Sequence, residues 1–420
     1  MADSWQTFPL EFKGGLLKNI SPLQQGINAP GSATVLQNFE PSIEGGYRKI
    51  EGFSKADSNA LSGSGNIRGI VRFGGAIIAA RGTHLYRSSG SGWTQLTDST
   101  SFPASTATAK VNGATSSTTT LVVDNNTGTI LVGMVVTGTG ISGTVTVQTV
   151  TDQNNLVLSS SQSLSNNVDL TFTEKSPTGK VRFAEYNFTG TDKLFIVDGN
   201  GKPYIFTGTS LAQQTSLASD FAGADFVTVH LERLFVAIGT TIICSGAASA
   251  SSDNFSGSTS FEFDGTITDI ITFREQLIIF SQNGIKKLTG KTNSDFAILP
   301  ITDDVGAIAP DTVQEVGGDV MFLAADGLRL LGATERIGDF SLAVVSKSIQ
   351  PEFSKFTANS TSFSSVTIRE KSQYRIFGYN AGFTDDSALG IIGTQFASQG
   401  GEGLGRNKRD KLFLCYKFIR

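Results

Sequence analysis

The sequence predicts an all-β protein, a β-propeller of about six four-stranded blades with a small inserted β-sandwich-like module. Three observations lead to this fold class. Apolar residues occur in short bursts that are mostly β-branched or aromatic, and few segments show the 3.6-residue spacing of helices. The bursts recur about every 40 to 50 residues, which is the period of a propeller blade. One long stretch also differs from the rest in composition.

Residues 267–290, ITDIITFREQLIIFSQNGIKKLTG, show the repeating unit most clearly. Two apolar runs are separated by Arg274, Glu275 and Gln276, which we expect to form a turn. Asn283 and Gly284 form the strongest hairpin dipeptide, because both residues accept a positive φ. The stretch therefore predicts three antiparallel strands with two tight turns. Three strands cannot bury both faces alone, so the unit must stack on neighbours.

Similar units occur along most of the chain, and each has a strand, a polar turn, a strongly apolar strand, a glycine-containing turn and a further strand. The first interval between units is too long for one blade unless residues 105–174 are an insertion. The units open at Ile67, Val181, Phe226, Ile267, Val313 and near Phe363.

The stretch 105–174 is rich in Ser, Thr and Val and almost free of charge. Its alternating apolar residues and its turns indicate a separate β module, and insertions in loops are well tolerated. The predicted division has four parts. Residues 1–66 are an extended lead-in that contributes strands to the propeller, 67–104 the first blade, 105–174 the inserted module, and 175–420 the remaining blades with a basic C-terminal tail.

One short helix is expected where Val344, Val345, Ile349 and Phe353 stand near helical spacing, with Pro351 ending it. In the lead-in, Pro22, Pro30 and Gly31 are expected to break regular structure. A strand is then expected over residues 33–41, ATVLQNFEP, followed by a glycine-rich hairpin.

The amino-acid composition limits the classes of function that we expect for this chain. The net charge of −4 and the pI of about 5.4 argue against a general nucleic-acid binder, which is usually strongly basic. Cys244 and Cys415 are far apart in sequence and suggest neither a disulfide framework nor a metal knuckle. We expect no secretion signal at the N-terminus and no membrane-spanning segment, because no apolar run approaches the ~20 residues needed.

Residues that could carry catalysis or bind a metal are few. His84 and His230 do not define a catalytic triad, and turn chemistry accounts for the carboxylates of residues 198–201 and 302–304. We therefore expect no enzymatic activity, no catalytic residue, no cofactor and no metal site.

The C-terminal stretch GRNKRDKLFLCYKFIR is basic and aromatic, so it could contact phosphates. Two other interpretations stay open: a lysine-guarded edge strand, and an altered reading frame after Gly405 that ends a blade early. The candidate phosphate contacts are Arg406, Lys408, Arg409 and Lys411.

Residues 14–53 carry the most informative pattern, a Gly-Gly stretch, a P-G-x-A-x-x-L-x-N strand and an R-K-x-x-G-F turn. The segment resembles the opening of the tail nozzle or tail hub family of short-tailed bacteriophages, also called tail tubular protein B or packaged-DNA stabilisation protein. Residues 326–353 resemble a late blade of the same group. The matching residues are Pro30, Gly31, Ala33, Leu36, Asn38, Arg48, Lys49, Gly52 and Phe53.

The resemblance implies a structural protein of the virion tail, made in the host cytoplasm. It implies a homo-oligomeric ring, six-fold in that family, that forms a DNA conduit retaining and then delivering the packaged genome. Its partners would be other tail proteins such as an adaptor and fibres, with transient, non-specific contact to genomic DNA. The alternative is a receptor- or glycan-binding β-propeller protein of the tail.

Overall fold

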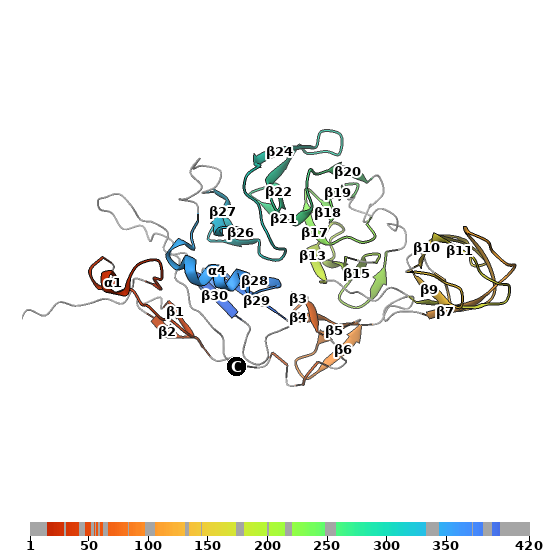
Figure 1. Ribbon diagram of the computed structural model, residues 1–420, viewed down its shortest axis with the longest axis horizontal. Helices are drawn as coiled ribbons and strands as arrows, with labels where there is room; N and C mark the ends of the chain where they lie inside the picture. Colours follow the sequence, from red (N-terminus) through yellow and green to blue (C-terminus); the bar gives the residue numbers. More distant parts are fainter. Residues whose placement is uncertain are drawn as a thin grey trace, which may run out of the picture. The chain divides into compact units, whose positions relative to one another are not determined.

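A computed structural model gives the fold (Figure 1). Contacts between residues divide the chain into two compact units. Unit 1 comprises Met1–Ser54, Gly265–Gly290 and Asp295–Arg420, and unit 2 comprises Lys55–Asp264 and Lys291–Ser294. The structure describes residues 15–28, 31–41, 47–51, 54, 56–57, 59–61, 66–82, 84–96, 106–130, 134–143, 145–173, 180–199, 201–214, 221–247, 258–332, 344–371, 373–380 and 389–394.

Unit 2 contains three four-stranded antiparallel sheets whose strands follow one another in chain order, as in propeller blades. The first sheet is β3 (Ile67–Phe73), β4 (Ala76–Arg81), β5 (His84–Ser88) and β6 (Trp93–Leu96). The second is β13 (Arg182–Tyr186), β14 (Lys193–Val197), β15 (Tyr204–Phe206) and β16 (Leu211–Gln213). The third is β17 (Phe226–His230), β18 (Arg233–Ile238), β19 (Thr241–Cys244) and β20 (Thr259–Glu262).

Unit 1 contains three further sheets of the same antiparallel kind and one small hairpin. The four-stranded sheet is β21 (Ile267–Phe273), β22 (Gln276–Ser281), β23 (Ile285–Thr289) and β24 (Ala297–Thr302). The three-stranded sheets are β25 (Gln314–Val316), β26 (Asp319–Ala324) and β27 (Gly327–Leu330), then β28 (Ser362–Ile368), β29 (Gln373–Tyr379) and β30 (Leu389–Thr394). The hairpin is β1 (Phe39–Pro41) with β2 (Tyr47–Lys49).

The predicted all-β class and the propeller type of sheet are confirmed. The composition of the blades differs slightly from the expected six sheets of four strands. Among the described residues, four blade-like sheets have four strands and two have three.

The three strands expected within residues 267–290 are confirmed as β21, β22 and β23, but the turn chemistry differs from the prediction. Arg274 and Glu275, without any glycine, take positive φ values of 47° and 60° in the first turn. Asn283 and Gly284 are not among the described residues with positive φ. The second hairpin is closed instead by the backbone and hydroxyl of Ser281, both of which pair with Gly284.

The first hairpin of four blades is built in the same way, with two successive residues at positive φ. These pairs are 74–75, 231–232, 274–275 and 317–318. Such turns match the right-handed twist of the strands that they join. The same type of turn therefore recurs at the first hairpin of four blade-like sheets.

Apolar cores form where neighbouring sheets face each other. In unit 1, Phe280 of β22 and Phe322 of β26 are fully buried, and their ring centroids are 5.3 Å apart. Both belong to one cluster that joins residues of the two sheets. In unit 2, Phe73 of β3 and Phe206 of β15 pack edge to face at 5.9 Å. The short apolar bursts of the sequence are thus strands buried between stacked sheets.

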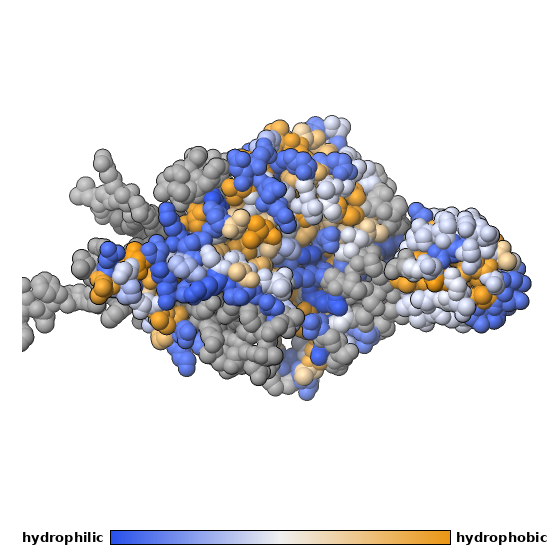
Figure 2. Space-filling model, viewed as in Figure 1, coloured by the Kyte–Doolittle hydropathy of each residue, from blue (hydrophilic) through white to orange (hydrophobic). Residues whose placement is uncertain are grey.

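A separate architecture occupies residues 106–173, within the stretch that composition sets apart. Six strands close a barrel in the order β10-β11-β8-β7-β12-β9, so the inserted module is a closed barrel rather than two stacked sheets. Figure 2 shows pale, weakly polar side chains over much of it, in keeping with its Ser and Thr content. Its strands are β7 (Thr106–Val111), β8 (Thr118–Thr127), β9 (Val135–Gly138), β10 (Val145–Asp152), β11 (Asn155–Gln162) and β12 (Asp169–Thr173).

The helices correct two expectations about proline. Pro351 does not end a helix; it stands in the first turn of α4 (Gln350–Ala358), where its missing N–H leaves no hydrogen bond unmade. A short 3₁₀ turn, Lys347–Ile349, precedes it. Pro22 likewise opens α1 (Pro22–Asn28) instead of breaking structure. The strand expected over residues 33–41 is regular at β1 alone, with Ala33 in an isolated bridge to Leu16. None of the helices in the described part of the chain has the length and apolar character to cross a bilayer.

Candidate functional site

Among the described residues of unit 1, a connected group of charged side chains joins the N-terminal segment to the sheet of β28–β30. We call residues 15–51 the strap. Glu40, the central residue of β1, has a side chain with 0% exposure. Its cross-strand partner in the hairpin is Arg48 of β2. A carboxylate removed from water in this way requires cationic partners and hydrogen-bond donors.

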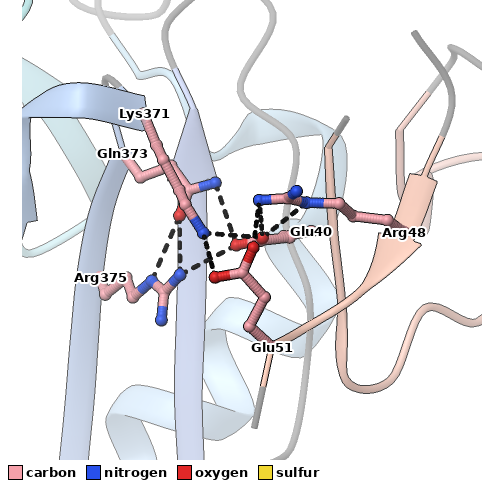
Figure 3. A network of polar contacts seen from close by, with 6 residues as sticks. All are labelled: Glu40, Arg48, Glu51, Lys371, Gln373 and Arg375. Carbon is pink, nitrogen blue, oxygen red and sulfur yellow. Dashed lines mark hydrogen bonds and ion pairs between the residues drawn. The ribbon is translucent and has the colours of Figure 1, made fainter. Parts of the chain in front are cut away.

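Four side chains supply these donors, and they converge on the two carboxylate oxygens (Figure 3). Oε1 of Glu40 is 2.8 Å from Nη2 of Arg48 and 2.9 Å from Nζ of Lys371. Oε2 is 3.0 Å from Nη2 of Arg375 and 3.4 Å from Nε2 of Gln373. Each carboxylate oxygen therefore has one strong cationic partner or more.

A second carboxylate and an amide complete this Glu40 network. Glu51 lies 3.0 Å from Arg48 and 3.5 Å from Lys371, so both cations bridge two acids. The amide oxygen of Gln373 accepts hydrogen bonds from Nε and Nη2 of Arg375, at 3.2 and 2.9 Å. The Arg375 guanidinium is thereby oriented toward Glu40.

The environment keeps Glu40 ionised. Burial by itself raises the pKa of Glu40, but the hydrogen bonds from Lys371 and Arg48, the charge of Lys371 and the bond from Gln373 outweigh it. The pKa therefore lies below its ordinary value. A carboxylate held in this form is a poor proton donor or acceptor near neutral pH. The arrangement suits fastening rather than acid–base chemistry.

Apolar contacts support the same attachment. Leu16 and Leu36 of the strap are 3% and 8% exposed and belong to the core that contains Phe353 of α4 and Ile376 of β29. The backbone N–H of Lys18 donates to the carbonyl of Ser348 at 2.8 Å. Within the strap, the Tyr47 hydroxyl accepts from the Gly15 N–H. The strap is thus held by two buried leucines and one buried ionic cluster.

Most residues of the P-G-x-A-x-x-L-x-N and R-K-x-x-G-F motifs lie in this strap, and the last two, Gly52 and Phe53, follow it in the chain. Gly31 and Asn38 take positive φ values of 78° and 58°. Ala33 pairs with Leu16, and Leu36 is buried in the core. Arg48 binds Glu40, whereas Pro30, Gly52 and Phe53 lie outside the described residues. Every described motif residue named here has a role in shaping or docking the strap.

Sequence analysis did not single out Glu40, Lys371, Gln373 or Arg375. A usable signal exists in residues 371–376, KSQYRI. In β29, positions 373 and 375 share one face and positions 374 and 376 share the other, while Lys371 ends the 3₁₀ turn Arg369–Lys371 that precedes the strand. Both Tyr374 and Ile376 are fully buried, so a polar face opposite them must either meet solvent or find a charged partner. The partner, more than 300 residues earlier, could not be inferred from this local pattern.

The other candidates are less connected. The predicted phosphate contacts Arg406, Lys408, Arg409 and Lys411 lie outside the described residues. His230 ends β17 beside Phe235, and burial together with Arg233 lowers its pKa. Across the described residues, no group of three or more His, Cys, Asp or Glu is placed to hold a metal ion.

The carboxylate of Asp198 has a turn role, whereas in residues 302–304 the turn hydrogen bond is made by a hydroxyl group. Oδ1 of Asp198 accepts from the N–H of Gly201 at 2.8 Å, and the Thr302 hydroxyl accepts from the N–H of Asp304 at 3.3 Å. Asp225 lies near Asp198. Burial raises the pKa of Asp225, the charge of Arg182 opposes this, and the charge of Asp198 adds to it.

Comparison with known proteins gives only distant similarities to solved structures. No family model matches the sequence, and no curated protein matches it. The computationally designed protein Ika8 is 9% identical, with 83% of this chain and 96% of that chain covered and a TM-score of 0.32. Hsv2p of Kluyveromyces lactis is 9% identical, with 82% and 94% covered and a TM-score of 0.33.

The endosialidase of phage phi92 is 12% identical, with 63% of this chain and 52% of that chain covered and a TM-score of 0.24. At these identities and TM-scores, none of the three similarities supports a conclusion about function.

Proposed function

We propose that this chain is a structural protein of a bacteriophage tail, a ring-forming subunit of the nozzle or hub that retains and then delivers packaged DNA. In this proposal it acts in the virion through rigid β-structure and subunit contacts, and it carries out no catalysis. Its partners are further copies of itself, other tail proteins such as an adaptor and fibres, and genomic DNA in transit.

The proposal rests on the structural roles that the residues of the N-terminal motif have in the strap. Among the residues that resemble the nozzle family, Gly31 and Asn38 bend the strap. Leu36 buries it in the core, and Arg48 binds it to Glu40. If the similarity were a chance match among exposed residues, Leu36 would not lie in a core and Arg48 would not bind a buried carboxylate. This supports a shared structural design of the segment.

A conduit requires that DNA pass between subunits. The centre of a single propeller is filled by side chains or holds a small ligand, so it is too narrow for a duplex. Identical subunits close a tube by head-to-tail contacts around a cyclic axis. The overall negative charge fits such a tube, because a lining rich in Lys and Arg would bind phosphates and slow transit.

The test is a reconstruction of the virion tail with an epitope tag on this chain. We expect the tagged density to repeat around the DNA axis in a closed ring. Density in a peripheral fibre, or in a single copy away from the axis, would contradict the conduit role.

A second candidate function, binding of a glycan or receptor on the host surface, is favoured by one feature of the barrel. Cross-strand pairing aligns four threonines in one row over four strands, and three of them are exposed. Rows of fixed hydroxyl groups can hydrogen-bond a polar ligand. The row is Thr127, Thr108, Thr171 and Thr137.

Glycan-array binding by the purified protein tests this alternative. The row variant Thr108→Val with Thr171→Val should lose any signal that the row provides. The matched control is Thr149→Val, an exposed threonine of β10 outside the row. Equal binding by both variants, or no binding by the unaltered protein, counts against the glycan hypothesis.

A further inference from the structure

We propose that the strap is exchanged between subunits: in the assembled ring, the strap of one copy docks on the β28–β30 sheet of the next copy and completes its Glu40 network. The inference rests on the proposed ring, and it names the contact through which one copy binds another. The single chain described here is then the closed form, in which the strap occupies its own docking site.

The first argument is connectivity. Glu40 binds residues 331 to 335 positions later in the chain. The stretch between the strap and its docking site includes all of unit 2. Since the site is built from two separate pieces of chain, a second copy can supply the first piece without changing any contact. Exchange of an identical element is a low-cost route to oligomers.

The second argument is the kind of contact. β1 and β2 pair with each other and do not extend any blade sheet. The strap is fastened mainly by side chains, Glu40 and Arg48 in the network and Leu16 and Leu36 in the core. One backbone hydrogen bond, from the Lys18 N–H to the Ser348 carbonyl, adds to them. These contacts can separate and form again without breaking the backbone hydrogen bonds between the strands of a blade sheet.

The third argument concerns the connection to unit 2. Asp57 accepts from the Gly92 N–H at 3.1 Å, and the Trp93 indole N–H donates to the carbonyl of Asn59 at 3.1 Å. The chain is therefore fixed to the β5–β6 turn again six residues after Glu51. Such a span reaches at most about 20 Å. Exchange over so short a span of chain is possible only between copies in direct contact, as in a closed ring.

The fourth argument is the exposed side of the strap. Leu23, Val35 and Phe39 are 88%, 63% and 40% exposed. Contact with a second copy would remove these apolar side chains from water, which is favourable. In the exchanged form these residues lie at the boundary between two copies, where a neighbour can cover them.

The experiment uses two full-length variants with opposite defects. The strap variant is Glu40→Lys, and the dock variant is Lys371→Glu with Arg375→Glu. Each variant alone pairs like charges within every strap–dock contact. When the two variants are co-expressed with different tags, two new contacts become possible. The native strap of the dock variant, with Glu40, can dock on the native basic site of the strap variant. The altered strap of the strap variant, with a lysine at position 40, can dock on the acidic site of the dock variant. Both contacts are then complementary, but only across two chains.

We expect the unaltered protein to form a ring by native mass spectrometry, each variant alone to stay monomeric, and the co-expressed pair to recover rings containing both tags. Circular dichroism of each variant checks that the blades are folded. The triple variant Glu40→Lys, Lys371→Glu, Arg375→Glu is the matched control, because it restores complementarity within one chain and should assemble alone.

Two failures are distinguishable. Rings of the unaltered protein without recovery on co-expression would overturn strap exchange and leave the ring proposal standing. Rings formed by the strap variant alone or by the dock variant alone would also overturn strap exchange. Failure of the unaltered protein to assemble at any concentration, alone or with the other tail proteins, would overturn both proposals.

Discussion

The barrel of β7–β12 and the strap are stabilised in opposite ways. The barrel closes on its own apolar core, in which every member lies between Ala107 and Phe172. The strap has no such core; it places Leu16 and Leu36 into the core of unit 1 and holds Glu40 against distant cations. The barrel therefore depends on its local sequence, whereas the strap depends on residues more than 300 positions away.

This difference predicts different responses to mutation. A defect in the barrel core should remain within the barrel, since the described buried cluster of the barrel consists of barrel residues. A defect in the Glu40 network should free the strap and leave the barrel unchanged.

The largest expected effect is in the barrel core. Phe172 is fully buried, so Phe172→Ala should lower the free energy of unfolding of the barrel by about 4 kcal/mol through lost burial and a cavity. Hydrogen exchange of the amides of β7–β12 measures this loss. Faster exchange in the strap as well would show that the two regions are coupled, contrary to the comparison.

The next effect is in the Glu40 network. Glu40→Gln leaves Arg375 buried without its counterion and should destabilise strap docking by about 3 kcal/mol, the usual cost of breaking a buried ion pair. Limited proteolysis should then cut the strap faster than in the unaltered protein. Unchanged cleavage of the strap would show that the ionic cluster contributes little to docking.

Acid should act on the strap through the same group. The folded-state pKa of Glu40 is lowered, so its stabilising contribution is fully present above the ordinary pKa of about 4.3. It is lost as the pH falls through the folded value. The cationic groups facing it are Arg48, Lys371 and Arg375, and Glu51 is a second carboxylate in the cluster.

The measurement is strap release against pH, followed by proteolysis or by a fluorophore on the strap. In Glu40→Gln the side chain at position 40 cannot be protonated in this pH range. The acid-induced release of the strap should therefore occur at a different pH or disappear. The same acid transition in both proteins would assign it to another group.

The smallest effect is at an exposed pair on the barrel. Lys110 lies 2.7 Å from Asp169, whose side chain is 82% exposed. Lys110→Met should change the stability of the barrel by less than about 1 kcal/mol, because water screens such pairs. Thermal unfolding of the barrel measures it. A loss as large as that of Phe172→Ala would show that the surface pair, and not the core, stabilises the module.

The same contrast explains how far the sequence predicts the structure. The strands of 267–290 follow from local apolar bursts, and the distinct composition of 105–174 agrees with a separate barrel core. Local patterns predict the structure less well where the role of a residue depends on its position in an element. The local pattern predicts that Pro351 ends a helix, but it lies in the first turn of α4, where proline is tolerated. Arg274 and Glu275 adopt positive φ values despite their side chains, because strand twist favours that turn.

The Glu40 network could not be predicted because its parts are polar residues in separate segments. Glu40 alone in FEP looks like a solvent-facing residue, and Arg375 alone in QYRIF looks like an ordinary strand charge. Burial of both becomes favourable only when each neutralises the other. Interactions of this kind are specified by tertiary structure, which a local pattern does not contain.

Hydrogen exchange of the full chain, comparing Glu40→Gln with the control Asp169→Asn, tests the central claim most directly. Both variants remove one carboxylate charge, one from a buried network and one from an exposed pair. The account predicts faster exchange in residues 15–41 and in β29 for Glu40→Gln, with unchanged barrel amides, and almost no change anywhere for Asp169→Asn. Unaltered exchange of the strap in Glu40→Gln, or equal effects of the two variants, would contradict the claim that buried ion pairs hold the strap.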